Sequence, residues 1–281
     1  MSRIKIGIIG GSGFYKMEEL QEQREVVVST PFGSPSAPIV EGRVDGVDVC
    51  MLARHGLEHT ILPGDINYRA NIWALKEIGV THILSVSACG SLKEEISPGS
   101  FVLLDSFLDR TQGRVQSFYG GDGFKGVAHT PMEPAFCSRT RSVLEKVCLN
   151  LNYKVFNSGT VVTIQGPRFS SKAESKMYRS LDASVINMTT VPEVCLAKEA
   201  GISYTCLALA TDYDCWKEDN QVDTPSVLRV LRENVSRVKV LLLALIPELN
   251  KEDWNQTIQE HRTVAANSVL GGECLKFDVQ E

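Results

Sequence analysis

The chain has 281 residues, of which 43% are hydrophobic and 22% charged, proportions that are ordinary for a globular protein with a sizeable core. Its formal net charge of −5 gives it no general attraction for nucleic acid or for acidic membranes, so any bound anion requires a local site. No run approaches the roughly 20 consecutive apolar residues of a membrane span. We therefore expect neither a nucleic-acid partner nor a membrane partner.

The first predicted strand ends in glycines, since residues 4–15 read IKIGIIGGSGFY. The third glycine of a dinucleotide-binding loop is missing because Lys16 occupies its position, and the Gly-Lys-Ser/Thr of a Walker loop is absent as well. Glycines let the backbone turn its amides toward one point, and Ser12 adds a hydroxyl donor. The segment therefore fits either an anion cradle or a plain tight turn after the strand.

Strand-like and helix-like segments alternate along the rest of the chain. A β-rich run at 48–54 precedes a helical pattern at 67–79 that Gly79 closes. Strands buried on both faces and alternating with helices indicate an α/β fold with a mixed central sheet, and we expect one domain over 1–281. The glycine-rich segment 117–126 is the best candidate for a mobile loop. The remaining predicted strands lie near 81–90, 100–109, 159–169, 183–190 and 203–214, and the remaining helices near 138–150, 170–181, 191–201, 225–246 and 251–266.

The eight cysteines are dispersed and form no C-x-x-C pair. Most lie in apolar runs, which favours small core residues in a reducing compartment over a disulfide framework. Among the five histidines only His55 and His59 have a spacing found in zinc sites, so we expect no metal. The chain start enters a strand without a small-residue cleavage site, so we expect no signal peptide and a cytoplasmic location.

Hydroxyl groups follow several of the predicted strands. In open α/β sheets, ligands bind outside the carboxyl ends of the strands. Ser12, Ser87 and Thr189 follow such strands, as does Arg54, and the sequence shows no carboxylate beside them. Each hydroxyl on its own could equally cap a helix. Hydroxyls and backbone amides around one arginine are the groups that bind phosphate, so the set as a whole predicts an anion site.

Two carboxylates gather in the segment ATDYDCW. Asp212 and Asp214 are two residues apart, so in an extended strand they would point to the same face. When two carboxyls share a partly apolar site, the pKa of one rises. The pair can then present one O–H donor and one acceptor, which complements the N7 acceptor and N6 donor of adenine. Alternatively, Asp214 caps the segment that follows.

Six segments of the chain resemble motifs of the trimeric purine nucleoside phosphorylase family. They are GGSGFY, LARHG, ACGSL, TIQGPRFSS, VINMTTVPEVCLAKEAGI and ATDYDCWKE, and the similarity spans about residues 4–270. The resemblance is to the members that act on S-methyl-5′-thioadenosine. It implies a single α/β domain, a homotrimer, and reversible cleavage of the N-glycosidic bond by phosphate, which yields adenine and 5-methylthioribose 1-phosphate. It also implies that the reaction needs no metal or organic cofactor, with inorganic phosphate as co-substrate.

The resemblance also assigns roles to individual residues. Asp212 and Asp214 would be the catalytic residues and would contact the purine. Phe169 would stack nearby, and Ser170 would lie beside the purine. Met188 would lie under the ribose. His59, Pro225, His129 and Leu270 would surround the 5′-methylthio group, the last two from neighbouring subunits or the tail. The phosphate ligands would be Ser12, Arg54, His55, Ser87, Ala88 and Thr189.

Two alternative functions make different predictions at the same positions. A 6-oxopurine nucleoside phosphorylase would carry Glu at the position of Ser170 and Asn at that of Asp212, and this chain has neither. A non-catalytic nucleoside-binding protein would have lost part of the phosphate set. The chain departs from the family pattern in having Ser12 and Ser87 where Thr is usual, Pro225 in place of Val, and an unfamiliar tail after Leu270.

Overall fold

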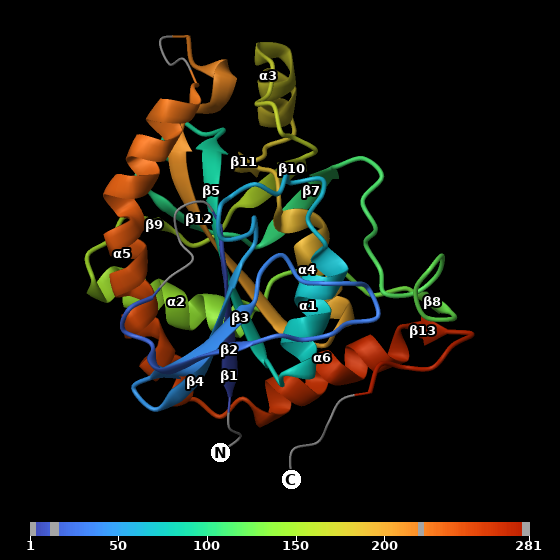
Figure 1. The fold of residues 1–281 in the computed structure, drawn as a ribbon. Coiled ribbons are helices and arrows are strands. Elements are labelled where there is room, and N and C mark those ends of the chain that lie inside the picture. Colours follow the sequence, from blue (N-terminus) through green and yellow to red (C-terminus); the bar gives the residue numbers. More distant parts are fainter. Residues whose placement is uncertain (1–3, 12–16, 219–221, 277–281) are drawn as a thin grey trace.

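Helices cover both faces of a large mixed sheet in the computed structural model, which describes residues 4–11, 17–218 and 222–276 (Figure 1). The main path through the sheet runs β2-β3-β4-β1-β5-β11-β10-β7, and β5 also pairs with β12, which leads through β6 to β9. The α/β fold with a mixed central sheet is therefore confirmed. The strands of this sheet are β1 (Lys5–Gly10), β2 (Gln21–Val26), β3 (Ile39–Val44), β4 (Val47–Ala53), β5 (His82–Ser91), β6 (Phe101–Leu103), β7 (Ser106–Arg110), β9 (Val155–Phe156), β10 (Thr160–Ile164), β11 (Val185–Asn187) and β12 (Ser203–Asp212).

Helices pack apolar side chains against both faces of the sheet, and α4 is buried almost all round. Ile72 of α1 and Leu196 of α4 belong to the core on one face, whereas Leu144 of α2 and Leu245 of α5 belong to the core on the other. Figure 1 shows α2 and α5 on the opposite side of the sheet from α1 and α4. The helices are α1 (Tyr68–Glu77), α2 (Ser138–Asn150), α3 (Lys172–Ser180), α4 (Thr190–Glu199), the short 3₁₀ helix η1 (Asp214–Trp216), α5 (Thr224–Asn250) and α6 (Asn255–Asn267).

Local signals account for several helix ends. Ser171 and Glu174 form a reciprocal capping box at the start of α3, as the sequence indicates. Gly79 has a φ of +82° just beyond α1, a left-handed conformation that glycine adopts without strain. α5 runs one turn further than predicted, because its buried stripe continues to Leu249.

The glycine-rich segment 117–126 is more firmly anchored than a loose surface loop. Phe118 is fully buried, and its ring lies 5.4 Å from the ring centroids of both Phe32 and Trp73. Phe124 packs against the same two rings. These aromatic contacts, which the sequence pattern does not show, anchor Phe118 and Phe124, and the mobility of the segment stays a prediction.

Most of the cysteines are buried, as predicted for small core residues. Six of the eight are buried, and none of the eight forms a disulfide. Within the described ranges, no helix combines the length and apolar character needed to cross a bilayer.

The sheet divides at the carboxyl end of β5. β5 pairs in parallel with β12 from His82 to Gly90, and its last residues pair antiparallel with β11. β1 lies between β4 and β5, parallel to both. The carboxyl ends of β4, β5 and β12 therefore open at one edge of the sheet, where ligands bind in folds of this kind.

Candidate active site

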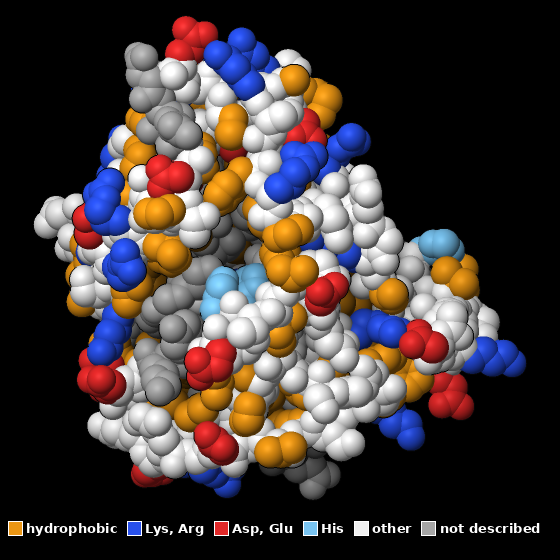
Figure 2. Space-filling view, turned by 45° about the horizontal axis from the view of Figure 1, so that its top comes forward, with side chains coloured by type: hydrophobic (Ala, Val, Ile, Leu, Met, Phe, Trp, Pro, Cys, Tyr) orange, Lys and Arg blue, Asp and Glu red, His pale blue; other side chains and the backbone are white. Residues whose placement is uncertain are grey.

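A pocket of about 340 Å³ lies at this edge of the sheet. Figure 2 looks onto the hollow, with histidine side chains inside it and hydrophobic side chains around its rim. Most of the residues singled out in the sequence line it, although they come from five separate segments. They are Arg54, His55, His59, Ser87, Ala88, Phe169, Ser170, Met188, Thr189, Asp212 and Asp214.

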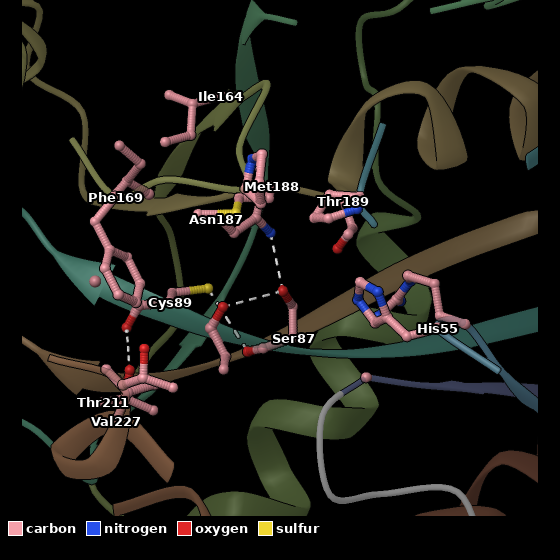
Figure 3. Close-up of a pocket in the computed structure, with 18 of the residues that line it drawn as sticks. His55, Ser87, Cys89, Ile164, Phe169, Asn187, Met188, Thr189, Thr211 and Val227 are labelled. Carbon is pink, nitrogen blue, oxygen red and sulfur yellow. Dashed lines mark hydrogen bonds between the residues drawn. The ribbon is translucent and has the colours of Figure 1, made fainter. Parts of the chain in front are cut away.

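One end of the pocket is built from hydroxyl groups and a buried guanidinium. Figure 3 shows Ser87, Thr189 and His55 close together there. Asn187 donates to the Ser87 hydroxyl (3.0 Å), which holds that side chain in place. The Thr189 hydroxyl does not cap α4, although Thr189 is the residue that precedes the helix. The Thr189 hydroxyl is therefore available to a ligand, whereas the Ser87 hydroxyl donates to the Ala88 carbonyl (3.3 Å) and would have to turn to donate to one.

Arg54 is the cation of this end, and it is not isolated from carboxylates as the sequence suggests. It is 1% exposed and makes a bidentate ion pair with the equally buried Glu193 of α4, at 2.7 and 2.9 Å. Its Nη2 also donates to Ser85 (2.6 Å), and its Nη1 to the carbonyl of Val86 (3.2 Å). Tyr204 donates to Glu193 as well (2.7 Å).

The ion pair leaves part of the guanidinium unused. Four of the five N–H groups of Arg54 are bonded, and among the described residues none accepts from the second hydrogen of Nη1. Arg54 lines the pocket. Burial opposes its charge, but Glu193 more than compensates and raises the pKa of Arg54 above its ordinary value. Arg54 therefore stays protonated and fixed in orientation, with one N–H group left for a ligand.

His55 is neutral at physiological pH. Burial lowers its pKa to about 4. Its Nδ1 lies 2.8 Å from the carbonyl of Ile61, so Nδ1 must carry the proton and Nε2 is left as an acceptor. The ring of His59 lies 4.5 Å away, and burial lowers its pKa too.

The other end of the pocket holds the two carboxyls. Asp212 accepts from the backbone N–H of Asp214 and from the Thr211 hydroxyl, each at 2.7 Å. Burial raises the pKa of both carboxyls above the ordinary 3.8. Each carboxyl can therefore hold a proton at a higher pH than an exposed aspartate. The sequence predicts this for one carboxyl of the pair.

Asp212 and Asp214 do not lie together for the reason that the sequence predicts, which is a shared strand face. β12 ends at Asp212, and Asp214 begins η1 with a φ of +49°, so the two carboxyls do not share the face of one strand. A tight turn brings both to the pocket instead. Gly90 makes room for them, since a Cβ there would lie 3.0 Å from Asp212 Oδ1 and 3.2 Å from Asp214 Cβ.

Unpartnered polar atoms mark this end as a binding site. Asp214 Oδ2 and the hydroxyls of Ser170 and Ser175 are buried and make no hydrogen bond of good geometry to the described residues, although both hydroxyls lie near enough to Asp214 to favour its charged form. Buried polar atoms are seldom left unsatisfied, so a ligand is the natural partner of those that line the pocket. Figure 3 shows the ring of Phe169 and the side chains of Ile164 and Val227 around this end.

Three predicted site residues do not line the pocket of this chain, and a fourth lies outside the described residues. Ser12 lies outside the described residues. Pro225 is at the start of α5, but its neighbours Thr224, Val227 and Leu228 provide the lining instead. His129 follows β8 (Val127–Ala128), which pairs with β13 (Val269–Leu270) in a separate two-stranded sheet. Both His129 and Leu270 are exposed there, and Figure 1 shows β8 and β13 apart from the carboxyl ends of β5 and β12.

The described residues form no group of three or more His, Cys, Asp and Glu side chains that could hold a metal ion.

Comparisons with known proteins identify the family. The phosphorylase superfamily matches residues 5–247. The S-methyl-5′-thioadenosine phosphorylases of Danio rerio and Anopheles gambiae are 52% and 51% identical over 272 residues, which cover 96% of this chain and 97% and 98% of theirs. The chain belongs to the S-methyl-5′-thioadenosine phosphorylase family.

Solved structures of this family share the fold. The methylthioadenosine phosphorylase of Schistosoma mansoni in complex with adenine is 43% identical, with a TM-score of 0.92 over 95% of this chain and 99% of that one. A variant of the adenosine/methylthioadenosine phosphorylase of that organism, in complex with methylthioadenosine, has a TM-score of 0.91 at 43% identity, over 95% and 98% of the two chains. The predicted family and fold class are thus confirmed.

Proposed function

We propose that the chain catalyses the reversible phosphorolysis of S-methyl-5′-thioadenosine to adenine and 5-methylthioribose 1-phosphate. The observation that carries the proposal is one pocket with a fixed positive charge at one end and two buried carboxyls of raised pKa at the other. The names of the relatives that are about half identical over nearly the whole chain point to the same reaction.

At the phosphate end, the free Nη1 hydrogen of Arg54 and the hydroxyls of Ser87 and Thr189 donate to the anion. Neutral His55 accepts through Nε2, so it suits a phosphate oxygen that carries a proton. Glu193 keeps the guanidinium from rotating, so the phosphate meets donors that are already oriented.

At the base end, a protonated carboxyl donates to N7 while its neighbour accepts from the N6 amino group. The bond from C1′ to N9 breaks, and its electron pair moves into the purine, where the proton at N7 neutralises it. A phosphate oxygen then bonds to C1′ of the positively charged sugar. Met188 lines the space between the two ends, where the ribose would lie.

The decisive experiment follows free adenine release from S-methyl-5′-thioadenosine with and without phosphate. We expect turnover only with phosphate, together with formation of the sugar phosphate. Equal turnover in phosphate-free buffer would favour a hydrolase. Binding without turnover in either buffer would favour a non-catalytic nucleoside-binding protein.

The 6-oxopurine alternative gains no support from the site. The O6 atom of a 6-oxopurine accepts hydrogen bonds, so an ionised carboxylate at the base end of the pocket would place two acceptors opposite each other. Ser170 and Asp212 also differ from the Glu and Asn that such enzymes carry at these positions. A panel with inosine and guanosine beside the thioadenosine substrate tests this directly.

We also propose a homotrimer whose active sites are shared between subunits. The exposed positions of His129 and Leu270, at opposite ends of the β8–β13 ribbon, support a role at a neighbour's pocket. Mixing inactive Asp212→Ala chains with inactive His129→Ala chains should then restore part of the activity. A fully active monomer in sedimentation would contradict the shared site.

The eight unpaired thiols support a cytoplasmic location.

A further inference from the structure

Arg114 is not among the residues that line the pocket, yet its guanidinium is bonded to the pocket's walls. Nη1 donates to the carbonyls of Met188 (2.7 Å) and Val191 (2.8 Å). Nη2 donates to the carbonyls of Gln165 (2.8 Å) and Ile164 (3.5 Å), and Nε to the side-chain oxygen of Gln165 (3.1 Å). Each of its five N–H groups therefore has an oxygen partner.

The oxygens belong to two segments that serve opposite ends of the pocket. Ile164 and Gln165 close β10 and lead into the loop that carries Phe169 and Ser170, at the base end. Met188 and Val191 flank Thr189, at the phosphate end. One side chain thus bonds both ends, from a segment 50 to 77 residues away in sequence.

The bond to Met188 also orients the next peptide. In a trans peptide the carbonyl and the following N–H point in opposite directions. Because the Met188 carbonyl points to Arg114, the Thr189 N–H points away from it, and among the described residues none accepts from this N–H. The N–H is therefore available to an anion, beside the Thr189 hydroxyl.

The geometry of arginine is essential to this arrangement. A planar guanidinium presents five donors in a fixed plane, whereas lysine presents three from a single nitrogen. All the acceptors of Arg114 are neutral oxygens, and burial lowers its pKa. Such a site gives up the charge pairing that usually accompanies a partly buried cation.

We propose that Arg114 is a positioning residue that sets the spacing between the phosphate end and the base end and aims the Thr189 N–H at phosphate. The inference rests on the proposed phosphorolysis. Arg114 acts through Thr189 and through the loop of Phe169, so its loss should weaken the binding of both substrates. The loss of a direct ligand at one end should weaken mainly one.

The experiment compares Arg114→Ala and Arg114→Lys with Arg110→Ala, which removes an exposed arginine from the nearby strand β7. We expect Arg114→Ala to raise the KM for phosphate and for the nucleoside together, with kcat/KM lower by on the order of 10²-fold. Arg114→Lys should recover little of this. Millimolar guanidinium should restore part of the activity of Arg114→Ala, while ammonium should not. Arg110→Ala should leave both KM values unchanged.

Unchanged KM values in a folded Arg114→Ala, or equal rescue by both cations, would overturn the proposal. If Arg114→Ala does not fold, Arg114→Lys carries the test, and full activity in it would overturn the proposal as well. Calorimetric adenine binding separates this inference from the proposed function. A wild-type chain that binds adenine without turnover refutes phosphorolysis, and unchanged adenine affinity in the Arg114 variants refutes positioning.

Discussion

The two ends of the pocket differ in how their buried ionisable groups are stabilised. At the phosphate end, Arg54 is held by Glu193, so its charge is permanent and four of its five N–H groups are committed. At the base end, Asp212 and Asp214 have raised pKa values, and Asp214 Oδ2 has no partner among the described residues. A bound anion needs a fixed cation, whereas a departing base needs a proton that can be transferred. The end with the Arg54–Glu193 ion pair suits phosphate binding, and the end with the two carboxyls suits proton transfer to the base.

The largest expected effect comes from breaking the fixed-charge end. Arg54→Ala removes the cation and leaves Glu193 buried and unpaired, so we expect a loss of about 3–5 kcal/mol in the free energy of unfolding. The apparent KM for phosphate should rise by about 100-fold or more, because a charge-assisted bond is lost, while the KM for the nucleoside changes much less. Urea unfolding and steady-state kinetics measure the two effects.

The double variant Arg54→Ala/Glu193→Gln separates stability from binding. It should recover much of the stability, because the buried charge is gone, and none of the phosphate affinity. If phosphate KM recovered together with stability, Arg54 would be a structural residue and the phosphate would be held elsewhere.

A smaller effect is expected from altering base recognition at the other end. In Asp212→Asn the amide oxygen can still accept from the Asp214 N–H, and Thr211 can turn its hydroxyl to accept from the amide nitrogen and donate to the Cys89 carbonyl. The fold should therefore survive. The new N–H suits the O6 of a 6-oxopurine, so the ratio of kcat/KM for inosine to that for methylthioadenosine should rise about ten- to hundredfold, or roughly 1–3 kcal/mol. Equal loss of both activities would assign the base-reading role to Asp214 instead.

The pH profile of kcat tests whether this end works by proton donation. A carboxyl that must be protonated is active below its pKa, so kcat should decline as pH rises through the raised pKa of the pair. Removing the responsible carboxyl should flatten that decline. A decline that is identical in wild type, Asp212→Asn and Asp214→Asn would show that neither group donates the proton.

The smallest effect comes from a third buried carboxyl, outside the pocket. Burial raises the pKa of Glu199 to about 7 from an ordinary 4.5, while it accepts from the Phe118 N–H (2.8 Å). The folded state therefore holds this proton more tightly than the unfolded state, and the contribution to stability, complete below pH 4.5, is lost as pH rises to 7. Relative to Glu199→Gln, the wild type should lose on the order of 2 kcal/mol between pH 5 and pH 8.

Paired urea unfolding at the two pH values measures this, with Glu233→Gln on the exposed side of α5 as the control. The kcat/KM profile should not change in Glu199→Gln. Altered catalysis in Glu199→Gln would mean that the titration of Glu199 is coupled to that of the carboxyls in the pocket.

Much of the local structure follows from short-range patterns. The capping box of Ser171 and Glu174 and the left-handed Gly79 are specified by a few neighbouring residues. The long apolar runs of β4, β5 and β12 could be assigned because strands buried on both faces leave few alternatives. β2 was missed because its residues, QEQREV, are almost all exposed and form no apolar pattern.

The chemistry of the site divides in the same way. The hydroxyls, the arginine and the two aspartates could be recognised in the sequence because they follow apolar strands, whose carboxyl ends converge in this fold class. The partnership of Arg54 with Glu193 could not, because 139 residues separate them and the pattern VPEVCLAKEA does not distinguish a buried carboxylate from one on the surface of a helix. The hydrogen bonds of Arg114 and the turn that brings Asp214 beside Asp212 likewise join residues that are distant in sequence or depend on local backbone geometry. The sequence by itself determined which groups are present and which strands they follow, since these depend on neighbouring residues. Only the tertiary structure decided which of those groups are charged, committed or free, because each of these properties depends on burial and on partners from distant segments.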